Sequence, residues 1–367
     1  MRVGRVSCDT SPSQRRSAVA TAVVAGLVVI SGSAVGCLDP KLKSGVSCSP
    51  QDHCPSPYFC TTDGSRVCVL HPYDGGGGSV AVDVATPPSH PLTAGGEGVW
   101  IFFDSLRGLN RDIFAVHPDG SAGWTVVSDP ATDQEPAVSP DGQTLAFSSN
   151  RTGLFQIYLM ALPAGAATRL TMDSKGAAQP AWSPDGSQVV YSGSQGLSAM
   201  TKDGSSARLV VGAPASPFGQ FQHPTFAPDG AIFSDQGNAI SEIDADGKGV
   251  TPIISGVAGS LQHPFVAANG LSMVFSTNVC AINGQRPING IWLVPLGEPI
   301  QICSTGSRLT SPSGAGSRFP SLGPGGLIAY ENEMTPAKIG ILLADGTTNT
   351  ITDGNSDDRN PSWGTLQ

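Results

Sequence analysis

The sequence of 367 residues contains 46 glycines and 30 prolines, and only 13% of its residues are charged. This content of turn formers argues against a helical protein, while an apolar fraction of 39% is too high for a disordered chain. The net charge is −9 and no cluster of lysine or arginine occurs, which argues against nucleic acid and anionic lipid as binding partners.

The first 36 residues have the pattern of an export signal. Four arginines precede an apolar run, Ala18–Ile30, which fits the core of a signal peptide and is too short to span a bilayer. Small residues then lead to Cys37, and Ala34–Cys37 resembles a bacterial lipobox, whose cysteine carries lipid and becomes the mature N-terminus. An ordinary signal peptidase would cut the same bond and leave a free thiol, so this alternative stays open.

The eight cysteines also favour lipidation. Cys8 leaves with the signal, and lipid on Cys37 then leaves six cysteines, an even number that can pair completely in an oxidising compartment. Four of them lie in the segment 37–70, which is too short to bury a core. We expect two disulfides there, and zinc is the weaker alternative because no Cys-x2-Cys pair occurs. The four are Cys48, Cys54, Cys60 and Cys68.

A linker separates this cysteine-rich segment from the rest of the chain. Residues 71–94 contain Gly75–Gly78 and several prolines, a composition typical of flexible and then stiffer linkers. The expected organisation is therefore a signal peptide at 1–36, a lipid-anchored cysteine-rich module at 37–70, a linker at 71–94 and a repeat domain at 95–367.

A proline-led motif recurs through the repeat domain. In each full copy a proline stands two residues before an apolar or aromatic residue, and a turn ending in glycine follows, as in Pro180–Gly186. Successive prolines are 44, 44, 40, 56 and 41 residues apart, a period typical of β-propellers with four strands per blade. They are Pro136, Pro180, Pro224, Pro264, Pro320 and Pro361.

The two ends of the repeat domain complement each other. Each period contains two glycine turns, which predict β-hairpins. The first unit, Gly98–Ser128, lacks the proline-led strand, and the last fragment, Asn360–Leu366, is that strand alone. Their pairing would close the ring and remove two sheet edges. The predicted fold is an all-β, six-bladed β-propeller closed by the C-terminal strand and preceded by a small disulfide-rich segment.

Two motifs carry a family resemblance. The motif Pro-x-Trp-Ser-Pro-Asp-Gly at Pro180–Gly186 and the segment Ser149–Tyr158 resemble the propeller repeat of TolB, the periplasmic protein of the Tol system, and the resemblance covers residues 95–367. It implies a propeller that binds another protein in the bacterial envelope. TolB has a larger α/β domain where this sequence has the cysteine-rich module, so we expect a TolB-like propeller on a different protein.

Catalytic motifs of related propellers are missing from the sequence. The repeat also occurs in propellers of prolyl-oligopeptidase relatives, but Gly-x-Ser-x-Gly, the motif of their nucleophile, occurs nowhere in the chain. We therefore predict no catalytic residue and no enzyme activity.

The residues before the motif prolines form a candidate binding site. They occupy one place in every blade and are expected to form a ring near a mouth of the central channel. Two imidazoles with Gln or Glu could hold a divalent metal, as in oligogalacturonate lyases, a related family with seven blades. We favour the alternative in which each histidine caps a strand, and we predict no metal or cofactor. The ring residues are Glu135, Gln179, His223, His263 and Asn360, with Phe319 as the sixth.

Cys280 and Cys303 lie in the fifth predicted blade. Cys280 falls in the long connection between the second and third strands, and Cys303 is expected at the end of the fourth strand, on the same face of the disc. A disulfide between them would hold the insertion Thr277–Gly290 in place, with a stabilisation of roughly 3 kcal/mol in the chain-entropy model.

These features together predict a noncatalytic, monomeric lipoprotein of the cell envelope whose propeller is a scaffold for a protein partner. The lipid would be its only contact with the membrane, and Leu38 after the cysteine resembles the sorting pattern of outer-membrane lipoproteins. The alternatives are a carbohydrate-binding or metal-dependent polysaccharide lyase-like propeller, with His223 and His263 near its site, and a structural propeller without a ligand.

Overall fold

The computed structural model describes residues 98–366, except 213–220, 256, 281–287, 298–299, 301 and 311–315, and three short strands before them. It separates into two units, Met1–His71 and Pro72–Gln367. The first contains β1 (Val46–Ser47), β2 (Tyr58–Cys60) and β3 (Val67–Leu70), in the sheet order β1-β3-β2, with Cys60 opposite Cys68 in the backbone register. The predicted signal peptide, Cys37, Cys48, Cys54 and the linker lie outside the described residues.

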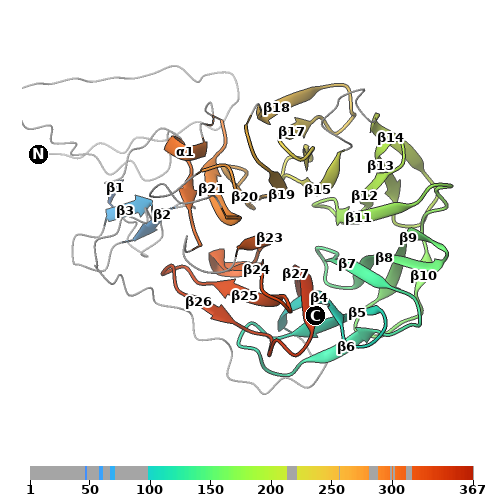
Figure 1. Cartoon of the computed structure of the whole chain (residues 1–367). Helices are drawn as coiled ribbons and strands as arrows, with labels where there is room; N and C mark the ends of the chain where they lie inside the picture. The colour runs from blue at the N-terminus through green and yellow to red at the C-terminus, as the bar shows by residue number, and fades with distance from the viewer. Residues whose placement is uncertain are drawn as a thin grey trace, which may run out of the picture. The chain divides into compact units, whose positions relative to one another are not determined.

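The second unit is a ring of six four-stranded antiparallel sheets, which confirms the predicted six-bladed propeller (Figure 1). Each blade below is given from the inner strand outward. Blade 1 is β27 (Asp357–Leu366), β4 (Gly98–Leu106), β5 (Arg111–Val116) and β6 (Trp124–Val127); blade 2 is β7 (Asp133–Val138), β8 (Thr144–Thr152), β9 (Leu154–Ala161) and β10 (Thr168–Arg169); blade 3 is β11 (Ala177–Trp182), β12 (Gln188–Gly193), β13 (Gly196–Thr201) and β14 (Ala207–Gly212).

The other three blades follow the same order. Blade 4 is β15 (Gln222–Phe226), β16 (Ile232–Asp235), β17 (Ile240–Ile243) and β18 (Val250–Ile254); blade 5 is β19 (Leu261–Val266), β20 (Ser272–Thr277), β21 (Gly290–Pro295) and β22 (Ser307–Arg308); blade 6 is β23 (Ser317–Leu322), β24 (Ile328–Asn332), β25 (Lys338–Leu342) and β26 (Thr348–Thr350). Two short helices, α1 (Ile302–Thr305) and η1 (Pro324–Gly326), complete the described elements. Among the described residues, no helix is long and apolar enough to cross a membrane.

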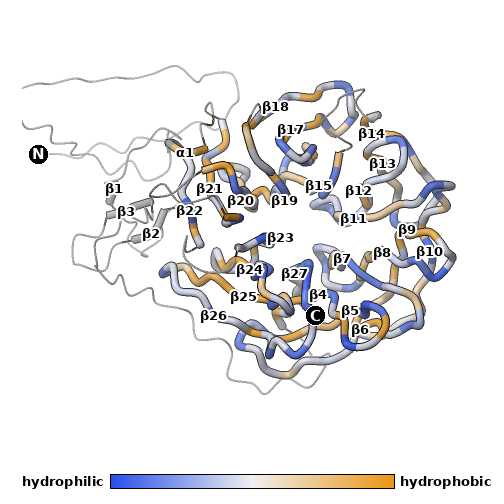
Figure 2. Tube along the Cα trace, viewed as in Figure 1, coloured by the Kyte–Doolittle hydropathy of each residue, from blue (hydrophilic) through white to orange (hydrophobic). Residues whose placement is uncertain are grey.

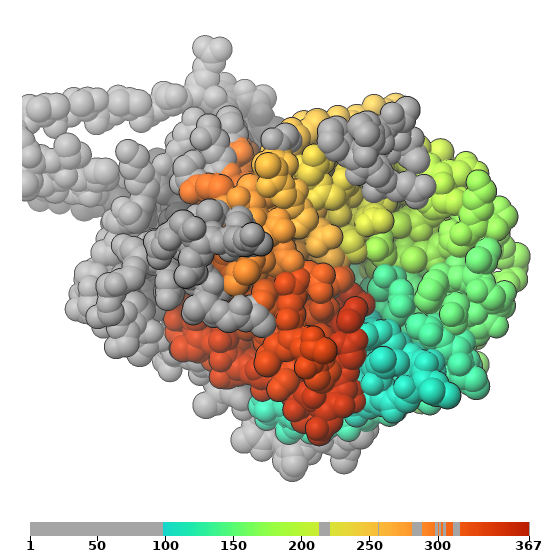
Figure 3. Space-filling model, in the orientation of Figure 1, coloured from blue at the N-terminus to red at the C-terminus, as the bar shows by residue number. Residues whose placement is uncertain are grey.

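The C-terminal strand closes the ring, as the sequence predicts. Strand β27 pairs antiparallel with β4, so that Trp363 lies opposite Ile101. The red atoms of β27 and blade 6 lie directly beside the cyan atoms of blade 1 in Figure 3. The indole Nε1 of Trp363 donates to the carbonyl oxygen of Ser321 in blade 6, at 2.7 Å. Trp182 makes the same bond to Ala137 of blade 2, at 3.0 Å, so the two tryptophans have equivalent roles between blades.

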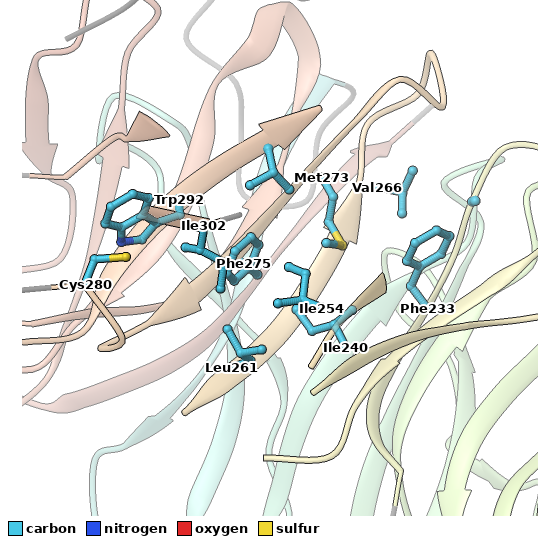
Figure 4. Close-up of a cluster of buried hydrophobic side chains, with 12 residues drawn as sticks. Phe233, Ile240, Ile254, Leu261, Val266, Met273, Phe275, Cys280, Trp292 and Ile302 are labelled. Carbon is cyan, nitrogen blue, oxygen red and sulfur yellow. The ribbon is translucent and has the colours of Figure 1, made fainter. Parts of the chain in front are cut away.

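The hydrophobic core lies between neighbouring blades. Hydrophobic segments run along the strands and hydrophilic segments gather in the connections (Figure 2). The cluster between blades 4 and 5 combines Ile240 and Ile254 with Leu261, Phe275 and others, all of them buried (Figure 4). Full burial of such a side chain contributes about 1.5–3 kcal/mol, so each interface between blades stabilises the whole ring.

A disulfide joins Cys280 to Cys303 in blade 5, with the Cα atoms 5.6 Å apart. Cys280 lies between β20 and β21, as expected. Cys303 does not end the fourth strand, as the sequence suggested, but lies in α1, before β22. The reason is that a helical turn occupies the connection from β21 to β22, which shortens the fourth strand to Ser307–Arg308 and shifts it along the chain.

Candidate functional sites on the propeller

All six residues before the inner-strand prolines have a left-handed backbone, with φ between 46° and 60°. The pairing register of each inner strand shifts at this residue. Such a conformation costs a non-glycine residue about 1–3 kcal/mol and persists where the surroundings compensate. Because it recurs in every blade, it is a property of the repeat. The residues are Glu135, Gln179, His223, His263, Phe319 and Asn360.

Hydrogen bonds between blades provide much of this compensation. In four of the six positions the backbone N–H donates to a side-chain oxygen of the preceding blade. These bonds run from Glu135 to Asp104 Oδ1 at 3.1 Å, from Gln179 to Glu135 Oε2 at 2.9 Å, from His223 to Gln179 Oε1 at 3.1 Å, and from His263 to Asp235 Oδ1 at 3.0 Å. The predicted ring residues are thus brought together as links between blades.

Three of the ring residues stack against one another. The ring centroids of His223 and His263 are 3.5 Å apart, and those of His263 and Phe319 are 3.7 Å apart. The Nδ1 atom of His223 lies 2.8 Å from Asp235 Oδ1. Both ring nitrogens of His263 are buried without a partner among the described residues, and burial lowers the pKa of His263 well below its usual value. The imidazole of His263 is therefore neutral.

This packing does not resemble a metal site. The rings of His223 and His263 pack at 44° with their centroids 3.5 Å apart, and the Nδ1 atom of His223 faces Asp235. Within the part of the chain that the structure describes, no group of three or more His, Cys, Asp or Glu side chains is arranged to hold a metal ion.

Three acidic residues beside these six ring residues were not predicted from the sequence. Asp104, Asp235 and Glu331 lie on the second strands of blades 1, 4 and 6, and none is more than 1% exposed. Strand pairing places each opposite the residue that precedes a ring residue. In the sequence, each of them is an acidic residue at the end of a buried apolar run. Ser148 occupies the equivalent position in β8.

Two of these carboxyl groups have strongly raised pKa values. Burial raises the pKa of Asp104 to about 6, although Arg111 lies 2.7 Å away and opposes the change. Burial also raises the pKa of Glu331 to about 7, against the effect of Arg318 at 3.4 Å. The Oε2 atom of Glu331 has no hydrogen-bond partner among the described residues. Burial therefore favours the neutral form of these two carboxyl groups.

The stability of the propeller should consequently depend on pH. Unfolded carboxyl groups ionise above about pH 4, whereas Glu331 in the fold stays protonated to about pH 7. Its stabilising contribution is complete below pH 4 and is lost as the pH rises to 7. Between pH 4 and pH 7 the free energy of unfolding should therefore fall by roughly 3 kcal/mol less in Glu331→Gln than in the wild type. Urea unfolding at several pH values measures it, and equal pH slopes in the two proteins would refute the assignment.

The two faces of the disc differ in chemistry. Turns between the first and second strands and between the third and fourth strands lie on one face, here called the turn face. Seven aspartates occur in its turns, and the Oδ1 atom of each accepts the N–H of the residue two positions later. These aspartate side chains therefore stabilise the turns. They are Asp119, Asp141, Asp185, Asp203, Asp229, Asp246 and Asp345.

The opposite face carries exposed apolar side chains. This loop face consists of the hairpins between second and third strands, such as 106–111 and 152–154, and of the links between blades, such as 128–132. Five of the eight exposed large hydrophobic residues in the described chain lie on it, in or next to blades 6, 1 and 2. They are Leu106, Leu109, Leu154, Met172 and Met334, exposed by 40–104%. Exposed apolar side chains gathered on one face are typical of a contact surface.

Hydrogen bonds hold part of the loop face in place. The side-chain amide of Asn110 donates to the carbonyl oxygens of Asp129 and Ala131, at 2.6 and 2.7 Å. In the next blade the Oδ1 atom of Asn150 accepts the N–H of Thr132, at 2.9 Å. These bonds join the hairpins of blades 1 and 2 to the link between them. An ordered backbone therefore supports the exposed apolar side chains in this part of the loop face.

The comparison with protein families decides the identity of the ring. Residues 96–268 match the model of the TolB beta propeller domain. This is a TolB-like propeller protein. The match confirms the resemblance that the proline-led repeats indicate. It covers three strands of blade 1, the whole of blades 2 to 4 and the first strand of blade 5.

Solved structures share the fold of the ring, and a curated relative matches a short part of the chain. TolB from Acinetobacter baumannii is 20% identical with a TM-score of 0.59, and the match covers 73% of this chain and 66% of that one. A chain of the nidogen–laminin complex is 11% identical with a TM-score of 0.58, covering 74% and 100%. The uncharacterised peptidase YuxL of Bacillus subtilis is 41% identical over 85 residues, which are 23% of this chain and only 13% of the peptidase.

Proposed function

We propose that this TolB-like propeller is a noncatalytic scaffold of the bacterial cell envelope that binds another protein through its loop face. The observation that carries the proposal is the gathering of exposed apolar side chains on the loop face, over hydrogen-bonded hairpins. An ordered surface binds a partner at a smaller entropic cost than a mobile one does.

The contacts beside the channel support a noncatalytic role. A general base must reach the proton that it removes from a substrate. His223 instead bonds to Asp235, and the Oε2 atom of Glu135 accepts bonds from the hydroxyl of Ser148 and the N–H of Gln179. These polar side chains are thus bonded to other parts of the fold, within and between blades, and we assign binding to the surface loops.

Photo-crosslinking in native envelopes tests the proposed scaffold. A benzophenone amino acid at Leu154 or Met172 should give one discrete adduct, because both positions lie on the loop face. The same amino acid at Leu271, an exposed leucine in a turn of the turn face, is the matched control and should give none. Adducts from Leu271 alone, or from no position, would contradict the proposal.

We also propose that lipid on Cys37 tethers the propeller to the outer membrane. Cys37→Ser should block processing or release the mature protein into the soluble fraction, since the tether would lack its acyl chains. Cell fractionation and gel mobility measure the outcome. A variant that is processed normally and stays in the membrane fraction would contradict the anchor.

A further inference from the structure

A pocket of about 260 Å³ opens where blade 6 meets blade 1. Its apolar lining includes Phe103, Phe114 and Trp124 of blade 1 and Ile351, which follows the outer strand of blade 6. Arg107 lines it from the hairpin that follows β4, on the loop face, and Gly120 and Gly123 line it from a turn of the turn face, so the pocket runs along the side of the two blades and reaches the loop face. Two charged residues, Arg107 and Asp353, also line it, and apolar walls with a few polar groups are typical of a site that holds a side chain of a ligand in one orientation.

The position of Arg107 differs from that of its counterpart in blade 2. Both Arg107 and Arg151 donate from Nε to the serine two residues earlier. Arg151 also donates from Nη2 to both carboxylate oxygens of Asp133, at 2.8 and 3.0 Å. Strand pairing makes Asp358 the counterpart of Asp133 in blade 1. The charge of Arg107 acts on Asp358, yet no hydrogen bond joins the two side chains.

Like Arg151, which lies over the ring of Tyr158, Arg107 lies over an aromatic ring, and in blade 1 this ring is a wall of the pocket. Its guanidinium carbon is 3.9 Å from the ring centroid of Phe114. The carboxylate of Asp353, which also lines the pocket, accepts bonds from the backbone and side chain of Asn355. The guanidinium is thus held over the ring of Phe114. The hydrogen bonds of Asp353 stay within its own turn and, together with the charge of Arg107, they lower the pKa of Asp353. A carboxylate is the group that a guanidinium in such a place binds best, through two parallel hydrogen bonds.

The apolar surface continues beyond the pocket. Leu106 and Leu109 flank Arg107 on the same hairpin, 40% and 104% exposed. A small carboxylic acid would fill the pocket and leave both leucines in water, whereas a polypeptide would cover them. The surroundings therefore favour a peptide segment.

We propose that the pocket between blades 6 and 1 binds a segment of the partner protein in which a large apolar side chain stands next to Asp or Glu. The apolar side chain enters between Phe114 and Ile351, and the carboxylate pairs with Arg107. This inference rests on the proposed scaffold function and names the part of the loop face that determines which partner is bound.

Selection from a phage library of random dodecapeptides on the immobilised full-length protein tests the site. Enriched peptides should contain Asp or Glu beside Phe, Trp or Leu. Their affinity should fall roughly tenfold or more in Arg107→Glu, because a charge-assisted pair is lost and a repulsion replaces it. Arg208→Glu, at an exposed arginine of blade 3, is the matched control and should bind as the wild type does. Equal melting temperatures show that both variants fold.

A charge exchange makes the test independent of folding. Peptides with the acidic residue replaced by Lys should bind Arg107→Glu more tightly than they bind the wild type. Enriched peptides that bind all three proteins equally, or the absence of any enriched peptide, would overturn the site. If the loop-face positions still cross-link to a partner in envelopes, only the pocket fails and the scaffold function stands.

Discussion

Truncation after Asp357 is expected to give a protein that aggregates or is rapidly cleaved by proteases. The deletion removes most of β27 and leaves β4 as an exposed edge strand, which can pair with other chains. Trp363→Ala should be milder and cost about 3 kcal/mol, because the half-buried indole packs between blades and bonds to Ser321.

Thermal unfolding and limited proteolysis measure both changes. Thr365→Ala, at an exposed residue of the same strand, should leave the melting temperature nearly unchanged and is the control. Trp182→Ala should resemble Trp363→Ala, because the two tryptophans make equivalent bonds between blades. A truncated protein that stays monomeric with an unchanged melting temperature would contradict closure of the ring by β27.

Replacement of Arg111 by Met should be as damaging as the loss of Trp363. Arg111 lies 2.7 Å from Asp104 and also pairs with Asp357, so it joins β5 to the buried second strand and to the closing strand. Without it, the fully buried carboxyl group of Asp104 has no charged partner, and removal of one partner of a buried pair costs about 3–5 kcal/mol.

The pH dependence and a double variant identify the cause of this loss. The defect of Arg111→Met should be smaller at pH 5 than at pH 8, because Asp104 has a pKa of about 6 in the fold and is largely neutral at pH 5. Combining it with Asp104→Asn should restore part of the stability at pH 8, since no buried charge remains. Urea unfolding of the four proteins measures the coupling. Losses that add independently at both pH values would refute a buried ion pair as the cause.

The blades and their closure could be predicted because they depend on local signals. The proline-led strand and the glycine turns repeat at a period that only a few folds have, and Trp363 stands at the same place in its repeat as Trp182. The helical turn at α1 was not predictable in this way, since it lies in blade 5, where the spacing of the prolines lengthens to 56 residues and the connections depart from the repeat.

The acidic residues beside the channel and the place of Arg107 depend on neighbours distant in the sequence. Asp104 belongs to the site only because strand pairing sets it opposite Arg359. Arg107 and Arg151 follow their serines with the same spacing and both lie over an aromatic ring, but of the two only Arg151 hydrogen-bonds to the aspartate opposite its serine. A repeat pattern therefore predicts where such a residue lies in its blade, but not which side chain it contacts.

Hydrogen-exchange mass spectrometry of the protein alone and with the partner captured by cross-linking tests the central claim most directly. If the loop face is the binding surface, the partner should slow exchange in the hairpins 106–111, 152–154 and 333–337. The turns of the turn face, such as 203–205 and 245–248, should exchange as they do in the free protein. Protection of those turns, with unchanged hairpins, would contradict the account.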